Sequence, residues 1–118
     1  MAKFLFVYRN SSEVEQAEMS PEDMQTAMEK WGIWFQQLGD RLVDGGDGLL
    51  PTGKVLKGDG TITDGPFIEA KELVGGYSIL QAASADEAVE LAKGCPIAAM
   101  GGTIEVRELA GYTETPPE

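Results

Sequence analysis

Polar side chains gather in one stretch of an otherwise ordinary chain. Residues 64–77 read DGPFIEAKELVGGY, and they include three carboxylates, one lysine and one tyrosine. Two carboxylates at one site can perform general acid/base catalysis when burial separates their pKa values. We therefore expect a small-molecule pocket beside this segment, with Asp64 and Glu69 as candidate catalytic residues.

Further side chains near this segment could bind the ligand. In an extended chain Lys71 lies on the same face as Glu69, where the two could orient a substrate. Phe67 and Tyr77 could line a cavity, and an arginine could hold an anionic group through its guanidinium. The candidates for ligand binding are Arg9, Phe67, Lys71, Glu72 and Tyr77.

Each of these candidates also has a simpler structural explanation. Asp64 opens an Asp-Gly-Pro sequence, which is typical of turns. Charge runs such as residues 69–72 usually form a solvated surface. Phe67 could pack in the core, and Arg9 could form an ordinary surface ion pair. The sequence leaves both explanations open, and under the structural one Asp64→Ala would affect only stability.

The composition argues against several classes of function. The chain has 118 residues, enough for one domain with its own core, and a formal net charge of −11. Nucleic acids and anionic membranes bind basic surfaces, so we expect neither as a direct partner. The chain has no histidine and a single cysteine, Cys95. These residue types supply the commonest metal ligands, so we expect no metal and no cofactor.

The same composition suggests where the protein works. No apolar run approaches the roughly 20 residues of a membrane span. Residues 1–3 lead directly into a strand-like segment and not into a secretion signal. We therefore expect a cytoplasmic protein. Cys95, between a glycine and a proline, is expected to be a small buried hydrophobe.

The first predicted helix follows a polar segment at residues 9–19. Ser20 is suited to the N-cap position and Pro21 to the first turn, and Gly39 is a plausible C-cap. Apolar residues then recur in steps of 4, 3, 4 and 3, which predicts one buried stripe. Trp34 lies on the flank of this stripe, which comprises Met24, Met28, Trp31, Phe35 and Leu38.

The second predicted helix begins with a capping box. Ser84 is the N-cap and Glu87 lies three residues later. The helix ends at Gly94, with Pro96 just beyond it. Its predicted buried residues are Ala88, Val89, Leu91 and Ala92.

The strands complete an α+β arrangement. The pattern predicts strands at 3–8, 41–50, 74–83 and 102–109, and a small hairpin from 53–56 and 61–63. Without the inserted hairpin the order is βαββαβ, a ferredoxin-like antiparallel sheet with two helices on one face. The first strand is apolar on both faces, with Phe4, Phe6 and Tyr8 on one and Leu5 and Val7 on the other. We therefore expect a homodimer through the sheet face that the helices leave open.

Residues 64–77 resemble the signature of the YCII-related family, in the branch named for its DGPF motif. Three other segments fit the family in the right order, at 20–24, 45–50 and 84–96. The resemblance covers nearly the whole chain, from Lys3 to about Leu109. It implies a ferredoxin-like fold that dimerises into an α+β barrel. We expect a single YCII-related domain at 1–112, followed by a flexible acidic tail at 113–118.

The resemblance implies no settled activity. Enzymes of the wider superfamily use the cavity between sheet and helices, which supports a small-molecule pocket near the DGPF motif. Another branch has a His-Asp pair proposed as catalytic, which a chain without histidine cannot share. Relatives resembling this branch accompany extracytoplasmic-function sigma factors in many bacteria. The alternative function is therefore a non-enzymatic regulatory partner protein of such a sigma factor system.

Overall fold

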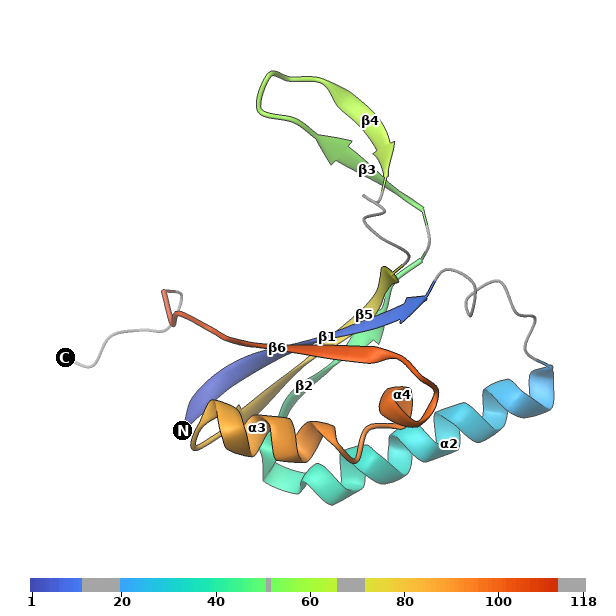
Figure 1. The fold of residues 1–118 in the computed structure, drawn as a ribbon, viewed down its shortest axis with the longest axis vertical. Coiled ribbons are helices and arrows are strands. Elements are labelled where there is room, and N and C mark those ends of the chain that lie inside the picture. The colour runs from blue at the N-terminus through green and yellow to red at the C-terminus, as the bar shows by residue number, and fades with distance from the viewer. Residues whose placement is uncertain (12–19, 51, 66–71, 113–118) are drawn as a thin grey trace.

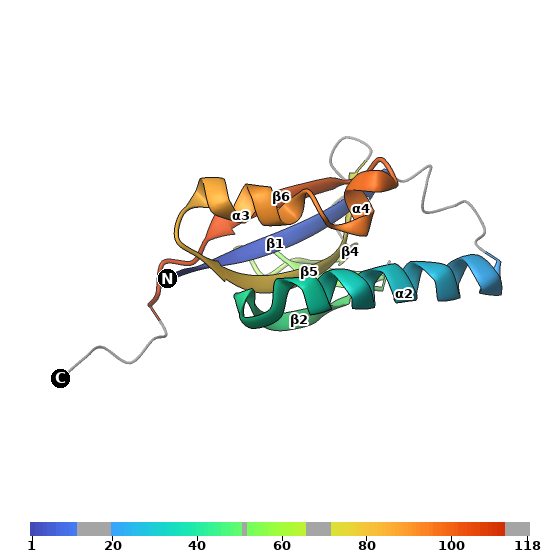
Figure 2. The same ribbon diagram turned by 90° about the horizontal axis from the view of Figure 1, so that it is seen from below.

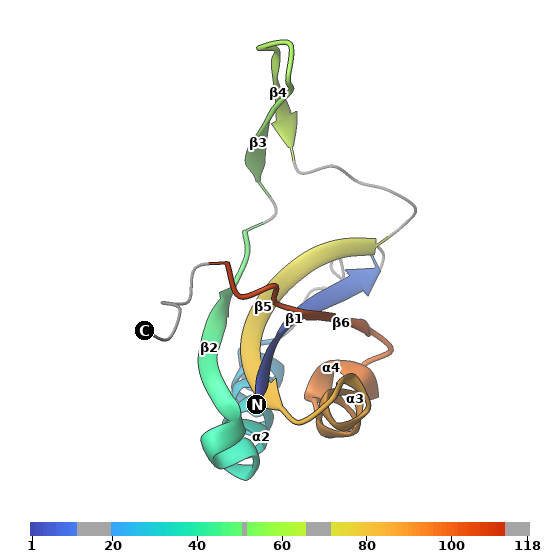
Figure 3. The same cartoon turned by 90° about the vertical axis from the view of Figure 1, so that its left-hand side faces the viewer.

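The computed structural model describes residues 1–11, 20–50, 52–65 and 72–112 (Figure 1). Four antiparallel strands form one sheet in the order β2-β5-β1-β6. Helices α2, α3 and α4 cover one face of this sheet (Figure 3). The sheet comprises β1 Ala2–Ser11, β2 Leu42–Gly48, β5 Glu72–Ala82 and β6 Thr103–Glu108, and the helices are α2 Pro21–Leu38, α3 Ala85–Ala92 and α4 Pro96–Ala99. The predicted ferredoxin-like α+β fold is confirmed.

Local signals place the ends of the long helix. The Asp23 backbone N–H donates to the Ser20 side-chain oxygen over 3.1 Å, and Pro21 is the first helical residue. Gly39, which has a φ of 55°, ends the helix, because glycine adopts positive φ without steric cost. A short 3-10 turn, Gly39–Arg41, then leads into β2.

The core lies where β1 and β5 meet the helices. Phe4 and Phe6 of β1 are 1% and 0% exposed, and Leu80 of β5 is 0% exposed. Phe6 packs against Trp34 of α2 with 6.4 Å between the ring centroids. The Trp34 indole N–H donates to the Leu91 carbonyl oxygen over 3.1 Å, so this buried tryptophan also ties α2 to α3.

The predicted stripe on α2 is wrong at its first two positions. Met24 is 54% exposed and Met28 is 73% exposed. The first turns of α2 extend beyond α4, where no described element covers them (Figure 2). The two tryptophans also exchange their expected places, because Trp34 is buried and Trp31 is only half-buried. Periodicity identifies an apolar arc, but its orientation toward the sheet depends on tertiary packing.

The second helical region begins as predicted and then divides. The Glu87 N–H donates to the Ser84 side-chain oxygen over 3.1 Å, which confirms the N-cap. Val89, predicted to be buried, is 45% exposed. Pro96 was predicted to lie just beyond the end of this helix. It is also the first residue of a further helix, α4. Proline suits the first turn of a helix because its missing N–H would have no helical partner there.

The predicted hairpin is present as β3 Gly53–Leu56 and β4 Ile62–Gly65. It projects away from the main sheet (Figures 1 and 3). Its cross-strand pair Leu56 and Ile62 is 72% and 66% exposed. Exposed apolar residues on a protruding hairpin are candidates for contact with another chain.

The sheet face away from the helices is also apolar at its centre. Leu5 and Val7 of β1 and Ile79 of β5 lie there, and each is half-buried. No helix in the described part of the chain is long and apolar enough to span a membrane. The expected tail at 113–118 lies outside the described residues, and the domain boundary at 112 stays a prediction.

Candidate functional site

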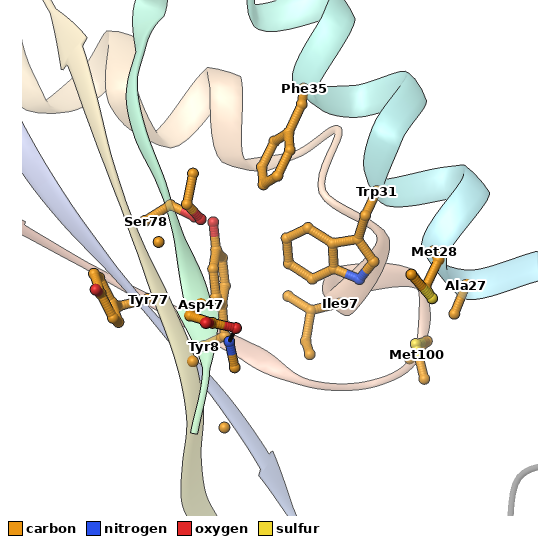
Figure 4. Close-up of a pocket in the computed structure, with 15 residues that line it drawn as sticks. Tyr8, Ala27, Met28, Trp31, Phe35, Asp47, Tyr77, Ser78, Ile97 and Met100 are labelled. Atoms are coloured by element: carbon orange, nitrogen blue, oxygen red, sulfur yellow. Dashed lines mark hydrogen bonds between the residues drawn. The ribbon is translucent and has the colours of Figure 1, made fainter. Parts of the chain in front are cut away.

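A cavity of about 500 Å³ lies between the sheet and the helices (Figure 4). Its helical side consists of apolar residues, most of them large: Ala27, Met28, Trp31 and Phe35 of α2, with Ile97 of α4 and the following Met100. Its sheet side is formed by Tyr8 of β1 together with residues 45–48 and 75–78. A volume of this size falls in the range typical of small-molecule sites.

Glycines create the hollow on the sheet side. A Cβ at Gly45 would lie 3.4 Å from the Phe35 ring. Gly46 has a φ of 67°, and a Cβ there would overlap the Tyr77 carbonyl oxygen. A Cβ at Gly76 would lie 2.9 Å from the Asp47 carbonyl oxygen. The backbone therefore comes closer here than side chains would allow, which leaves space in front of the strands.

Tyr8 places a hydroxyl at the inner end of this cavity. The residue is only 5% exposed, and its ring meets Trp31 edge-on with a centroid distance of 4.9 Å. Its hydroxyl oxygen has almost no accessible surface and lies beside the Ser78 side chain (Figure 4), whose interaction with it offsets a part of the effect of burial on its pKa. Burial raises the pKa of Tyr8 well above its ordinary value. The side chain is therefore neutral at physiological pH and can donate a hydrogen bond.

The hydroxyl group of the neighbouring Ser78 already donates a hydrogen bond within the protein. Its hydroxyl donates to the Gly45 carbonyl oxygen over 2.7 Å, and the side chain is fully buried. This bond joins β5 to the irregular part of β2, where the strand register shifts. Ser78 therefore fixes the glycine-rich wall and still offers its oxygen as an acceptor.

Asp47 supplies a negative charge at the cavity. It is exposed, and its carboxylate is directed toward the cavity in Figure 4. One carboxylate oxygen accepts from the Gly48 backbone N–H over 2.8 Å, which holds the side chain in place. Of the described residues that line the cavity, Asp47 alone is charged at neutral pH.

Asp64 does not lie at this cavity. It is in β4 of the projecting hairpin, where its side chain is 90% exposed and pairs with Lys54 over 2.8 Å. Tyr77 does border the cavity, but its side chain points away from it (Figure 4). In the described chain these two candidates are therefore neither together nor directed at the same space.

A surface ion pair was one of the two interactions expected for Arg9, and the structure contains such a pair with Glu105. Its guanidinium lies 3.2 Å from the Glu105 carboxylate, which Arg107 contacts over 3.1 Å. Hydrogen bonds from Arg107 and Arg9 hold the pKa of Glu105 below its ordinary value. All three residues lie on the open face of the sheet, opposite the cavity.

The remaining candidates cannot be placed. Phe67, Glu69 and Lys71 lie outside the described residues, and so does the side chain of Glu72, whose backbone begins β5. Their proposed roles therefore stay predictions. Within the described ranges, no three acidic or cysteine side chains come together as a metal site would require.

Sequence reasoning did not identify the residues that do form the cavity. Tyr8 was assigned to one face of a buried strand, and a hydroxyl in a series with Phe4 and Phe6 was the signal that could have marked it. Gly75 and Gly76, which belong to the segment 64–77 that the sequence singled out, also border the cavity. Nothing in the sequence marked Ser78 and Asp47, because only the pairing of distant strands brings them to the same cavity as Tyr8.

Comparison with known proteins agrees with this architecture. No curated protein matches the chain significantly. The family model of the YCII-related domain matches residues 5–112. This range contains every described helix and strand, apart from the first residues of β1. The chain thus belongs to the YCII-related domain family.

Proposed function

We propose that this protein binds a small organic molecule in the cavity between α2 and the sheet. The observation that carries the proposal is the cavity itself, about 500 Å³ of space between the sheet and α2. Its walls are mostly apolar, and the Asp47 carboxylate lies at it. A concave, mostly apolar site with a few polar groups is the usual form of a small-molecule site.

The position of the cavity also supports the narrower assignment to the DGPF-motif branch. The last residues of the segment that resembles the branch signature, Gly75 to Tyr77, border the cavity. Carboxylate acid/base chemistry is part of the same proposal. Asp47 is the carboxylate present at the cavity. Asp64 lies on the hairpin, so a role for it would require the hairpin of a second copy to reach this site.

The functional unit in this proposal is a homodimer that joins two open sheet faces. The half-buried side chains of Leu5, Val7 and Ile79 form the apolar centre of that face. A second copy related by a two-fold axis would cover it. We expect the protein to sediment as a dimer at micromolar concentration. Val7→Lys, opposite Glu105 in the sheet, should give a folded monomer.

The control for this variant is Met24→Lys, at an exposed position on α2, which should remain dimeric. A wild-type monomer at micromolar concentration would rule out the dimer.

Native mass spectrometry of protein purified from a cell extract tests the pocket itself. We expect a fixed extra mass that is released when the same sample is denatured. Trp31→Ala, which removes a wall of the cavity, should reduce the fraction that carries this mass, whereas Tyr112→Ala, at a residue that is 95% exposed, should not. An empty protein that also shows no thermal shift with a broad metabolite panel would contradict the proposal.

A second candidate function is that of a regulatory partner in the bacterial cytoplasm, associated with an extracytoplasmic-function sigma factor. The exposed Leu56 and Ile62 on the hairpin favour it, because they offer an apolar contact on a protein whose net charge of −11 suits a basic partner. Changing both residues to Thr should then abolish the effect on sigma-dependent transcription in a reporter strain. Loss of that effect in Trp31→Ala, with the hairpin variant unchanged, would contradict it.

A further inference from the structure

Three aromatic rings border the cavity at steep angles to one another. Trp31 and Phe35 of α2 and Tyr8 of β1 all line it. The plane of the Trp31 ring is inclined by 77° to that of Tyr8 and by 65° to that of Phe35. Figure 4 shows Trp31 and Phe35 directed into the cavity. The rings therefore form walls of different orientation around one space.

The faces of these rings attract positive charge. An aromatic ring has a negative face, which attracts a cation within about 6 Å of the ring centre, and tryptophan does so most strongly. Trp31 and Phe35 are half-buried, so each keeps surface that a ligand in the cavity can reach. An alkylated ammonium group suits such walls, because its methyl groups also bury apolar area against them.

Asp47 adds a full negative charge at the same cavity. Its carboxylate is directed toward the cavity and accepts a hydrogen bond from the Gly48 backbone N–H over 2.8 Å (Figure 4). In the described part of the chain every ion pair involves another carboxylate, and no lysine or arginine borders the cavity. A cation in the cavity would therefore meet a carboxylate that has no cationic partner among the described residues.

The opening of the cavity favours an apolar body on the ligand. Met28 is 73% exposed and Met100 is 43% exposed, and both border the cavity. Methionine is unbranched and polarisable, so it can adapt to ligands of different shape. A cavity of about 500 Å³ has room for more than a small ammonium ion, since drug-sized molecules occupy sites in this range.

We infer that the ligand of this cavity is an organic cation, with an alkylated ammonium group and an apolar body. The ammonium group lies against the faces of Trp31 and Phe35 and is paired with the Asp47 carboxylate. The formal net charge of −11 on the chain acts in the same direction, because it attracts cations and repels anions. This inference rests on the proposed function, because it names the class of molecule that the same site binds.

Equilibrium dialysis of the full chain with three matched probes tests the inference. The probes are benzyl(2-hydroxyethyl)dimethylammonium, 3,3-dimethyl-4-phenylbutan-1-ol and 3,3-dimethyl-4-phenylbutanoate, which share a phenyl body and a branched centre. The alcohol has carbon in place of the cationic nitrogen, and the butanoate carries a negative charge. We expect the ammonium probe to bind about tenfold more tightly than the alcohol, and the butanoate to bind most weakly.

Two variants separate the contributions of the charge and the ring. Asp47→Asn should weaken the ammonium probe about fivefold and leave the alcohol unchanged, because only the charge is removed. Trp31→Leu keeps an apolar wall but removes a ring, so the preference for the ammonium probe over the alcohol should fall about threefold. The matched control is Asp40→Asn, which removes the same charge from an exposed position outside the cavity and should change no affinity. Circular dichroism checks that each variant is folded.

Equal affinity of the wild type for the ammonium probe and the alcohol would overturn the inference, and so would preferred binding of the butanoate. Equal weakening by Asp47→Asn and Asp40→Asn would assign the effect to net charge and overturn the pairing with Asp47. If no probe binds, but native mass spectrometry finds another bound molecule, the class is wrong and the site remains. If the protein is also empty in that measurement, both the class and the proposed function are wrong.

Discussion

The space between the sheet and the helices is packed at one end and hollow at the other, although the same two strands, β1 and β5, run through both ends. Along the face of β5 toward the helices, side-chain size falls from Leu80 to Ser78 to Gly76, opposite Phe4, Phe6 and Tyr8 of β1. At the first end the large residues meet Trp34 and fill the space. At the second end the small ones face Trp31 and leave a cavity.

This difference shows how two strands in constant register can contribute to both a core and a pocket. From Phe4 to Tyr8 the pairing of β1 with β5 continues unchanged, while the side-chain volume on β5 falls and the neighbouring β2 shifts its register. The packed end holds the fold together through buried apolar area. The hollow end has unfilled space and a backbone that requires glycine, and neither feature stabilises a fold.

The largest expected effect is at the packed end. Phe6 is fully buried, so Phe6→Ala should lower the free energy of unfolding by about 3–5 kcal/mol through lost transfer energy and a new cavity. Trp31→Ala removes a half-buried side chain beside an existing cavity and should cost clearly less. Urea unfolding of both variants measures this. Equal losses would contradict the distinction between the two ends.

A smaller but still clear loss is expected from the glycine wall of the hollow end. Gly46→Ala puts a Cβ against the Tyr77 carbonyl oxygen at a positive φ, so the free energy of unfolding should fall by about 2–3 kcal/mol. Thermal unfolding with Gly58→Ala as control measures it, since a Cβ at Gly58 meets nothing within 4 Å. A harmless Gly46→Ala would show that the wall can move.

The pH dependence of stability tests the burial of two ionisable groups, Cys95 and Tyr8. Cys95 is buried as expected, and burial raises the pKa of its thiol to about 11 from an ordinary value of 9.0. The stability that the neutral thiol contributes is complete below pH 9 and is lost as the pH rises toward 11, at about 1.4 kcal/mol per pKa unit.

Chemical unfolding between pH 8 and pH 11 should therefore show a decline that is shallower in Cys95→Ala than in the wild type. Because the pKa of Tyr8 is raised as well, some decline should persist in that variant. Identical slopes for the two proteins would contradict the burial of the thiol.

The smallest effect is expected at Asp64. Exposed ion pairs contribute at most about 1 kcal/mol, so Asp64→Ala should change the free energy of unfolding by less than about 0.5 kcal/mol. In native mass spectrometry the fraction that carries a bound mass should match that of the wild type. A lower fraction in the folded variant would show that the hairpin takes part in the site after all.

Much of the fold was predictable because its signals are local. Ser20 and Ser84 cap their helices through hydrogen bonds to residues three positions ahead. Alternation along β1 placed Phe4, Phe6 and Tyr8 on one face, and all three are buried there. Such signals need only the neighbouring residues, so the sequence alone identifies them.

The site was predictable only in part, because it depends on contacts between distant segments. Nothing in the sequence places Tyr8 beside Ser78 and Trp31, since the pairing of β1 with β5 and the rotation of α2 bring them together. The same rotation buried Trp34 where the apolar stripe had favoured Trp31. Asp64 stood out because of its neighbours in the sequence, yet the hairpin carries it away from the cavity. Element type follows from local chemistry, whereas a cavity arises from the packing of whole elements, which tertiary structure alone decides.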